Sequence, residues 1–300
     1  MTSRIGRPLF TFIRPLAALV VAAAVLAGCV TSAGVAGSSA PGGSGTPEAS
    51  ATGLSASGGF YMRAWQTQAL APQYMFGSLP SVTIAGGQFI DGMVAIPMIY
   101  PGATYVGLSA RSISGAGVDA IVAEARKDGL LGDKSAFTEG VMPGSITAHI
   151  QLVVNGVTHD LSGSLPSDTT TSSTAPGTAD AFHAFWNRIS SLGTWLAADL
   201  GQSNPYTPTS IAVMLTPPVA APADLKVQET AWPLSGTLAT FGAPLGTSGY
   251  RCGVVTGSDL GKLLPAVQAS NQLTRFTDST GAKMSLQVEV LVPGDAGPCA

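Results

Sequence analysis

The residues on either side of Asn155-Gly156 alternate between apolar and polar, and this pattern constrains the fold more than any other part of the chain. A two-residue type I′ turn favours Asn-Gly, because both of its central residues need positive φ. We therefore expect a β-hairpin over residues 146–161, in which Val154 pairs with Val157 and Leu152 with His159. One face would then carry the largely apolar set Ile150, Leu152, Val154, Val157, His159 and Leu161, and the other face would be mostly polar.

A second hairpin is expected to turn at residues 278–281, since apolar and polar side chains alternate after it over residues 284–290. The chain contains 37 glycines and 21 prolines, and only 10% of its residues are charged. This composition favours many strands and loops over long helices. Further strands are expected at residues 81–84, 104–110, 210–215 and 251–255.

Three segments show apolar residues at helical spacing. The first begins near Ser114 and is capped near Gly129, and the second runs from about residue 180 to residue 200. The third starts at Ser258-Asp259 and contains Pro265, which should kink it or start a fresh turn. We therefore predict an α+β fold, in which about three amphipathic helices pack on antiparallel hairpins.

The order strand, Gly/Ser turn, amphipathic helix and hairpin occurs at residues 104–163 and again at 250–293. This weak internal repeat predicts two similar β-α-β-β lobes. Residues 162–178 are rich in Ser, Thr, Pro and Gly, and we expect them to form a flexible loop. The predicted lobes are then residues 59–161 and residues 179–300.

The N-terminus combines Arg4, Arg7 and Arg14 with an apolar run over residues 17–27, a pattern typical of a secretory signal. The run is shorter than the ~20 residues that a membrane-spanning helix needs. Leu26-Ala27-Gly28-Cys29 resembles the processing site of a bacterial lipoprotein. We therefore predict a lipoprotein signal peptide over residues 1–28 and lipidation of Cys29, with ordinary secretion and an incidental cysteine as the alternative.

Residues 29–58 are almost all Ser, Gly, Ala, Thr and Pro, and such a composition cannot bury enough apolar surface to fold. We expect a disordered tether that holds the folded part off the extracytoplasmic face of the cell membrane. Three of the 14 basic residues precede Cys29, so 11 basic and 17 acidic side chains remain, a net charge of −6. Because they include no basic cluster, nucleic acid is not an expected partner.

Two further cysteines remain once Cys29 is assigned to the lipid. Cys252 and Cys299 form an even pair in an exported chain, where an oxidising compartment favours a disulfide. Metal binding by these two residues is the weaker interpretation, since no nearby histidine completes a tetrahedral set.

The candidate catalytic side chains are three histidines and several scattered carboxylates. In the hairpin register His149 and His159 face opposite sides of the sheet, which argues against a metal site shared between them. Aliphatic neighbours predict that His159 is a satisfied core residue, and His183 is expected at the edge of the second helix's apolar stripe. The carboxylates that could form a hydrolytic pair in space are Asp91, Glu139 and Asp160.

The sequence contains no nucleophile elbow, phosphate-binding loop, dinucleotide fingerprint or zinc-protease motif. We therefore assign no catalytic residue, no metal site and no cofactor.

Several stretches carry a resemblance to a known family. They are Arg251-Cys252-Gly253-Val254-Val255, Asp259-Leu260, Leu263-Leu264-Pro265-Ala266, Asn271-Gln272-Leu273-Thr274, Val154-Asn155-Gly156-Val157-Thr158-His159, and residues 117–132 and 292–299. In these the chain resembles an uncharacterised family of secreted or lipid-anchored proteins of high-GC Gram-positive bacteria. The resemblance implies that Cys252 and Cys299 belong to the family framework, and it supplies no catalytic residues.

Together these features predict a lipid-anchored, extracytoplasmic binding or envelope-interaction module without enzymatic activity, whose ligand is a protein or a small molecule. The competing hypothesis is an exported hydrolase that uses carboxylates or His159. A solute-capturing protein for a transporter is a third class, but the alternation of strands and helices that its two α/β lobes would need is not visible.

Overall fold

A computed structural model describes residues 59–67, 76, 80–93, 99–137, 146–165, 175–218, 220–246 and 249–299. The predicted signal peptide, Cys29 and the predicted tether lie outside the described residues. Residues 51–300 form a compact unit of their own. None of the helices in the described part of the chain is long and apolar enough to cross a membrane.

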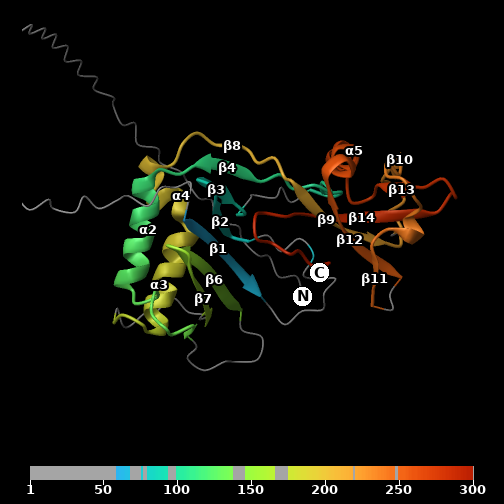
Figure 1. Ribbon diagram of the computed structural model, residues 1–300. Helices are drawn as coiled ribbons and strands as arrows, with labels where there is room; N and C mark the ends of the chain where they lie inside the picture. The colour runs from blue at the N-terminus through green and yellow to red at the C-terminus, as the bar shows by residue number, and fades with distance from the viewer. Residues whose placement is uncertain are drawn as a thin grey trace, which may run out of the picture. The chain divides into compact units, whose positions relative to one another are not determined.

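The first sheet confirms the antiparallel character of the predicted α+β fold (Figure 1). Its eight strands run in the order β5-β7-β6-β1-β2-β3-β4-β8, and the neighbours are antiparallel except for the parallel pair β5 and β7. The strands are β1 (Phe60–Thr67), β2 (Val82–Ala85), β3 (Gln88–Asp91), β4 (Ser109–Ser112), β5 (Ala136–Phe137), β6 (Thr147–Val154), β7 (Val157–Ser164) and β8 (Asn204–Pro205).

The second sheet has six strands in the order β10-β13-β14-β9-β12-β11, with β10 and β13 as its parallel pair. Its strands are β9 (Ser210–Thr216), β10 (Glu229–Ala231), β11 (Ala243–Leu245), β12 (Tyr250–Thr256), β13 (Arg275–Thr277) and β14 (Lys283–Val290). The predicted second hairpin is therefore confirmed as β13 and β14, which are joined through residues 278–282.

The helices are α2 (Gly115–Lys127), α3 (Ala179–Ser190), α4 (Leu192–Trp195) and α5 (Gly257–Gln268), with short 3-10 turns η1 (Ala197–Asp199) and η2 (Leu238–Thr240). Helices α2 and α5 lie close to the predicted positions, and α3 begins close to its predicted start. The Ser114 hydroxyl accepts from Gly117 N and caps α2, and Gly129 follows its end at φ +70°.

The prediction of one continuous helix over residues 180–200 is wrong, because α3 ends at Ser190. The Ser191 hydroxyl donates to the carbonyls of Asn187 and Arg188 at 3.0 and 3.2 Å. Serine side chains that bond to the preceding turn in this way compete with the regular helix pattern. The chain then continues as the short elements α4 and η1.

The hairpin register is the predicted one. Val154 pairs with Val157 and Leu152 with His159, and Asn155 and Gly156 have φ of 52° and 78°. Leu161 is buried as expected, but Val157 is exposed, because it directly follows the turn at the end of the hairpin.

The main core of the first sheet includes α3 and α4, which corrects the predicted lobe boundary. Phe182, Phe185 and Trp186 of α3 are buried with Met62 of β1 and with Ile121 of α2. Figure 1 shows α2 and α3 beside the part of the sheet formed by β1, β6 and β7. Residues 179–200 therefore belong with the first sheet and not with a C-terminal lobe.

The close approach of α3 to the first sheet depends on a glycine within the predicted loop 162–178. Residues 162–164 continue strand β7, so this part of the loop prediction is wrong. A Cβ at Gly163 would lie 2.6 Å from the ring of Phe182, so only glycine leaves room for the helix there.

The core of the second sheet forms between β9, β12, β14 and α5, around Val213, Leu263 and Phe276. A smaller cluster joins the two sheets. Ile90, Leu108 and Ala110 pack there with Val290 and Val292, which come from the end of β14 and the residues after it.

Candidate functional site

The three histidines lie in separate environments. His149 stacks on Trp65 with ring centroids 5.1 Å apart, its Nε2 lies 2.8 Å from Thr67 Oγ1, and burial lowers its pKa. His183 is buried in α3 directly after Phe182 of the apolar stripe, and its Nε2 lies 2.6 Å from the Ser164 carbonyl oxygen.

His159 lies on the opposite face of the hairpin from His149, as predicted, because it pairs with Leu152. It is half-buried, so the prediction of a core residue is wrong. It lies two residues after exposed Val157, near the Asn155-Gly156 turn of the hairpin.

The predicted carboxylate candidates do not converge. Asp160 in β7 accepts a hydrogen bond from Gln151 at 2.8 Å, and Asp91 in β3 accepts one from the Met93 amide at 2.9 Å. Three strands separate β7 from β3, which corresponds to about 19 Å across the sheet. Hydrolytic carboxylate pairs lie about 5–10 Å apart. Glu139 lies outside the described residues.

A metal centre is likewise missing from the part of the chain that the structure describes, where no three His, Cys, Asp or Glu side chains come together. Cys252 and Cys299 instead form the predicted disulfide, with Cα atoms 5.2 Å apart.

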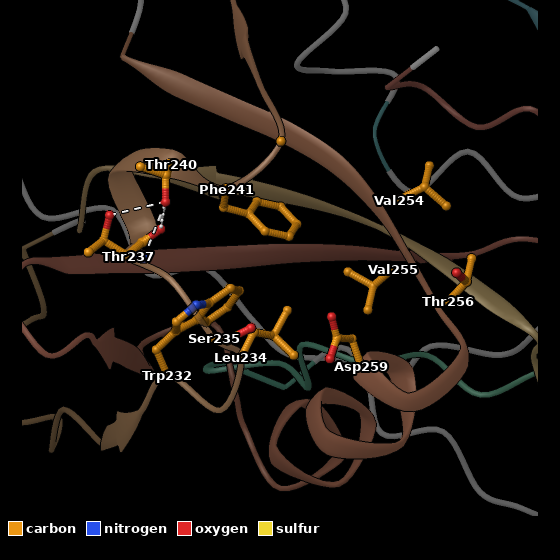
Figure 2. A pocket seen from close by; sticks show the side chains of 11 residues that line it. Trp232, Leu234, Ser235, Thr237, Thr240, Phe241, Val254, Val255, Thr256 and Asp259 are labelled. Carbon is orange, nitrogen blue, oxygen red and sulfur yellow. Dashed lines mark hydrogen bonds between the residues drawn. The ribbon is translucent and has the colours of Figure 1, made fainter.

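A groove of about 300 Å³ on the second sheet is a candidate binding site (Figure 2). The loop over residues 232–242, the end of β12 and the first turn of α5 surround it. We call it the Trp232 groove, and its lining residues are Trp232, Leu234, Ser235, Thr237, Thr240, Phe241, Gly242, Val254, Val255, Thr256 and Asp259.

Aromatic packing fixes one wall of the Trp232 groove. The ring of Trp232 meets the rings of Phe241 and Phe276 edge to face, at centroid distances of 5.4 and 6.3 Å. Trp232 and Phe276 are buried, while Phe241 is half-buried and faces the groove in Figure 2. Edge-to-face contacts stabilise such clusters beyond the burial of their area.

Arg251 of β12 holds the end of the same loop. Its Nε donates to the Phe241 carbonyl at 2.6 Å, and one terminal nitrogen donates to the Gly242 carbonyl at 2.8 Å. Thr237 and Thr240 bond each other's side chains and backbone around η2. The 232–242 loop is therefore held at η2 by the two threonines and at its C-terminal end by Arg251.

Asp278 holds the middle of the 232–242 loop through a hydrogen bond to Leu238. One carboxylate oxygen accepts the Leu238 amide at 2.8 Å, and the other accepts the Thr280 hydroxyl at 2.6 Å and the Thr280 and Ala282 amides at 2.9 and 3.1 Å. The Thr280 hydroxyl, together with these amides, lowers the pKa of Asp278. The carboxylate thus joins the loop to the turn between β13 and β14.

The chemistry of the Trp232 groove suits binding more than catalysis. Ser235, Thr237, Thr240 and Thr256 supply hydroxyls that donate and accept hydrogen bonds. Among its described lining residues, Asp259 is the one charged side chain, and Lys262 lies 2.8 Å from it. A single exposed carboxylate offers no acid–base pair, but it orients a ligand that donates hydrogen bonds.

Sequence reasoning missed this groove because its loop carries no periodic pattern. The available signal was Trp232 and Phe241 on either side of a Ser-Gly-Thr turn. Comparison of the chain with models of protein families, with curated proteins and with solved structures found no match.

Proposed function

We propose that this chain is a non-enzymatic binding module of the extracytoplasmic membrane face, anchored by a lipid at Cys29. We further propose that it binds a small polyhydroxylated ligand, such as a mono- or disaccharide, in the Trp232 groove. The resemblance to lipid-anchored proteins of high-GC Gram-positive bacteria is consistent with this placement and stays a prediction.

The observation that carries the binding proposal is the set of hydroxyls and one carboxylate beside a fixed aromatic wall. Sugars present hydroxyls to such polar side chains and apolar C–H groups to aromatic rings. The volume of about 300 Å³ lies at the lower end for small-molecule sites, which suits one or two sugar rings. Because Arg251 and Asp278 hold the loop, binding would cost little ordering of the site.

Titration calorimetry and NMR with a panel of neutral mono- and disaccharides test the ligand class. We expect saturable binding, and Asp259→Asn should weaken it about tenfold or more, because a charge-assisted hydrogen bond contributes about 1.5–3 kcal/mol. Asp224→Asn, an exposed carboxylate outside the groove, is the matched control and should leave binding unchanged. Absence of saturable binding by every sugar would sink this part of the proposal.

The anchor is tested separately by fractionating cells that produce the wild-type chain or Cys29→Ala. Two acyl chains are needed for stable anchoring, so the wild-type chain should incorporate labelled fatty acid and sediment with membranes. Cys29→Ala should incorporate none. Equal incorporation by both chains would refute lipidation at this residue.

A further inference from the structure

Strand β14 has a long neighbour on one side and a short one on the other. On one side it pairs with β9 from Ser285 to Val290. On the other side β13 pairs with Lys283 and Met284 alone. In the described part of the chain, no strand pairs with the rest of β14 on that side, so this part of β14 is an open edge.

The hydrogen-bond pattern identifies the backbone groups that face the open edge. In an antiparallel pair, alternate residues exchange hydrogen bonds with the neighbouring strand, and the residues between them point the other way. The Leu291 amide donates to the Ser210 carbonyl at 3.2 Å, so the odd-numbered residues of β14 bond to β9. The amides and carbonyls of Leu286 and Val288 therefore face the open edge.

The turn between β13 and β14 shows the same alternation. The Asp278 amide donates to the Ala282 carbonyl at 3.1 Å, so the even-numbered residues point toward the side of β13. Among the described residues, no group bonds to the outward amides and carbonyls of Leu286 and Val288. Unpaired ladder groups of this kind are a template for pairing with another extended chain.

A groove of about 390 Å³ lies along this edge. Leu286 and Val288 line it together with Ala103 and Gln272, which come from two segments that pair with each other through Ala103 and Asn271. Its volume lies within the range of small-ligand sites, so it accommodates a short stretch of extended chain and not a whole strand.

The two faces of β14 differ in chemistry along the groove. Leu286 belongs to the core of the second sheet and Val288 packs against that core. Ser285, Gln287 and Thr216 supply hydroxyl and amide groups on the opposite face. None of the described residues that line the groove carries a charge. An added strand would therefore meet apolar and polar surroundings at alternate side chains.

We propose that an extended, uncharged segment of a partner protein pairs antiparallel with β14 at Leu286 and Val288. Its side chains alternate between apolar residues and residues with hydroxyl groups. Strand addition gains affinity from main-chain hydrogen bonds and specificity from alternate side-chain positions. Residues 29–58 of this chain suit the edge less well, because they are rich in Gly and Ala, which are depleted in strands.

This edge shares no lining residue with the Trp232 groove, so the proposal does not depend on sugar binding. Hydrogen exchange by NMR tests whether the edge is open in the chain from residue 30 onward, which lacks the predicted signal peptide and Cys29. The amides of Leu286 and Val288 should exchange at least about tenfold faster than the Gln287 amide, which bonds to β9. Equal protection of all three amides would overturn the proposal, because the edge would then already be paired.

Peptide binding is measured by NMR titration with acetyl-Thr-Val-Thr-Val-Thr-amide. We expect saturable shifts centred on Leu286 and Val288, and slower exchange of both amides in the complex. The same peptide with both valine nitrogens methylated should bind at least about fivefold more weakly, because two main-chain donors are lost. Equal affinity of the two peptides, or no saturable shift of these two amides, would contradict strand addition.

Two variants of the protein test the same edge. Val288→Pro removes an amide that faces the edge and leaves the bonds to β9 in place, and Ala103→Trp fills the groove from an exposed position. Both should weaken peptide binding by about tenfold or more. Ala184→Trp, at an exposed position of α3, is the matched control and should bind like the wild-type chain.

Unfolding midpoints in urea verify that each variant is folded. Ala103→Trp keeps the test decisive if Val288→Pro is destabilised, because Ala103 is exposed. Equal peptide affinity of Ala103→Trp and Ala184→Trp would refute binding in this groove.

Discussion

The guanidinium of Arg63 in β1 lies 2.8 Å from the carboxylate of Asp295 in the C-terminal tail, 232 residues later in the chain. The same guanidinium donates to the Gly294 carbonyl at 3.2 Å, and the Tyr61 hydroxyl donates to the Pro293 carbonyl at 3.0 Å. Strand β1 therefore holds the tail against the first sheet. The disulfide holds the end of the same tail on β12 of the second sheet.

Loss of this ion pair should destabilise the fold. Only 17% of the Arg63 side chain and 7% of the Asp295 side chain are exposed, so Asp295→Ala leaves a largely buried cation without its partner. We expect the free energy of unfolding to fall by about 2–4 kcal/mol in urea titrations. Lys262→Ala breaks the exposed pair with Asp259 and should cost less than about 1 kcal/mol. Equal losses in the two variants would contradict the importance of the tail contact.

Reduction of the disulfide should also destabilise the unit. Cys252 and Cys299 are 47 residues apart, and closing a loop of that length restricts the unfolded chain by about 4 kcal/mol in the chain-entropy model. Urea titration of the wild-type protein with and without a phosphine reductant measures the difference. The double variant Cys252→Ala, Cys299→Ala should already be destabilised and should not respond to the reductant. A response in that variant would show that the reductant acts elsewhere.

Local sequence patterns were enough to predict the fold class and several elements. The type I′ turn at Asn155-Gly156 fixes the register of β6 and β7. A slip of one residue would move every side chain of one strand to the opposite face of the sheet, so the alternating apolar pattern favours the same register. Helix α2 is likewise determined by its own residues, because Ser114 caps its start and Gly129 follows its end. Each of these signals lies within a few residues of the structure that it determines.

The remaining features depend on contacts between distant residues. The packing of α3 on the first sheet depends on the space that Gly163 leaves for Phe182. The spacing of apolar residues in the sequence does not predict this contact. The loop of the Trp232 groove is fixed by Asp278, whose carboxylate accepts an amide 40 residues earlier. Strands β10 and β11 have three residues each, too few for an alternating pattern to be recognised.

The predicted internal repeat of strand, helix and hairpin matches the structure only in part. Both halves contain a helical crossover between parallel strands, β4 to β6 through α2 and β12 to β14 through α5. Three strands separate the first pair, whereas β9 alone separates the second. The order of elements along the chain could indicate the crossovers, but it could not show how many strands are inserted between them.

The contact between Gly163 and Phe182 predicts a large effect from a small substitution. In Gly163→Ala the new methyl group meets the Phe182 ring and lies 3.0 Å from the Phe137 carbonyl oxygen. We expect a loss of about 1–3 kcal/mol in unfolding free energy by urea titration. Gly261→Ala is the matched control, because nothing lies within 4 Å of its Cβ in α5. That variant should gain about 0.5–1 kcal/mol from helix propensity, and a loss there would contradict the assignment.

Burial of His149 predicts a dependence of stability on pH. Its folded pKa is lowered, while the unfolded chain has the ordinary value of about 6.5. As the pH falls below about 6.5, the unfolded state therefore takes up a proton before the folded state does. The contribution of His149 to stability is fully present above that pH and is lost as the pH falls through the folded pKa. Urea titrations between about pH 7.5 and about pH 5.5 measure this loss.

Substitutions at His149 and at Trp65, its stacking partner, distinguish the contribution of His149 to this pH dependence from that of other titrating groups. His149→Gln should flatten the dependence of unfolding free energy on pH in this window. Trp65→Ala removes the ring that stacks on the imidazole, so the NMR titration of His149 should move back toward its ordinary pKa. The Arg63 guanidinium lies 4.6 Å from the centroid of the same Trp65 ring and remains in both variants. An unchanged His149 titration in Trp65→Ala would show that burial under this ring is not what lowers the pKa.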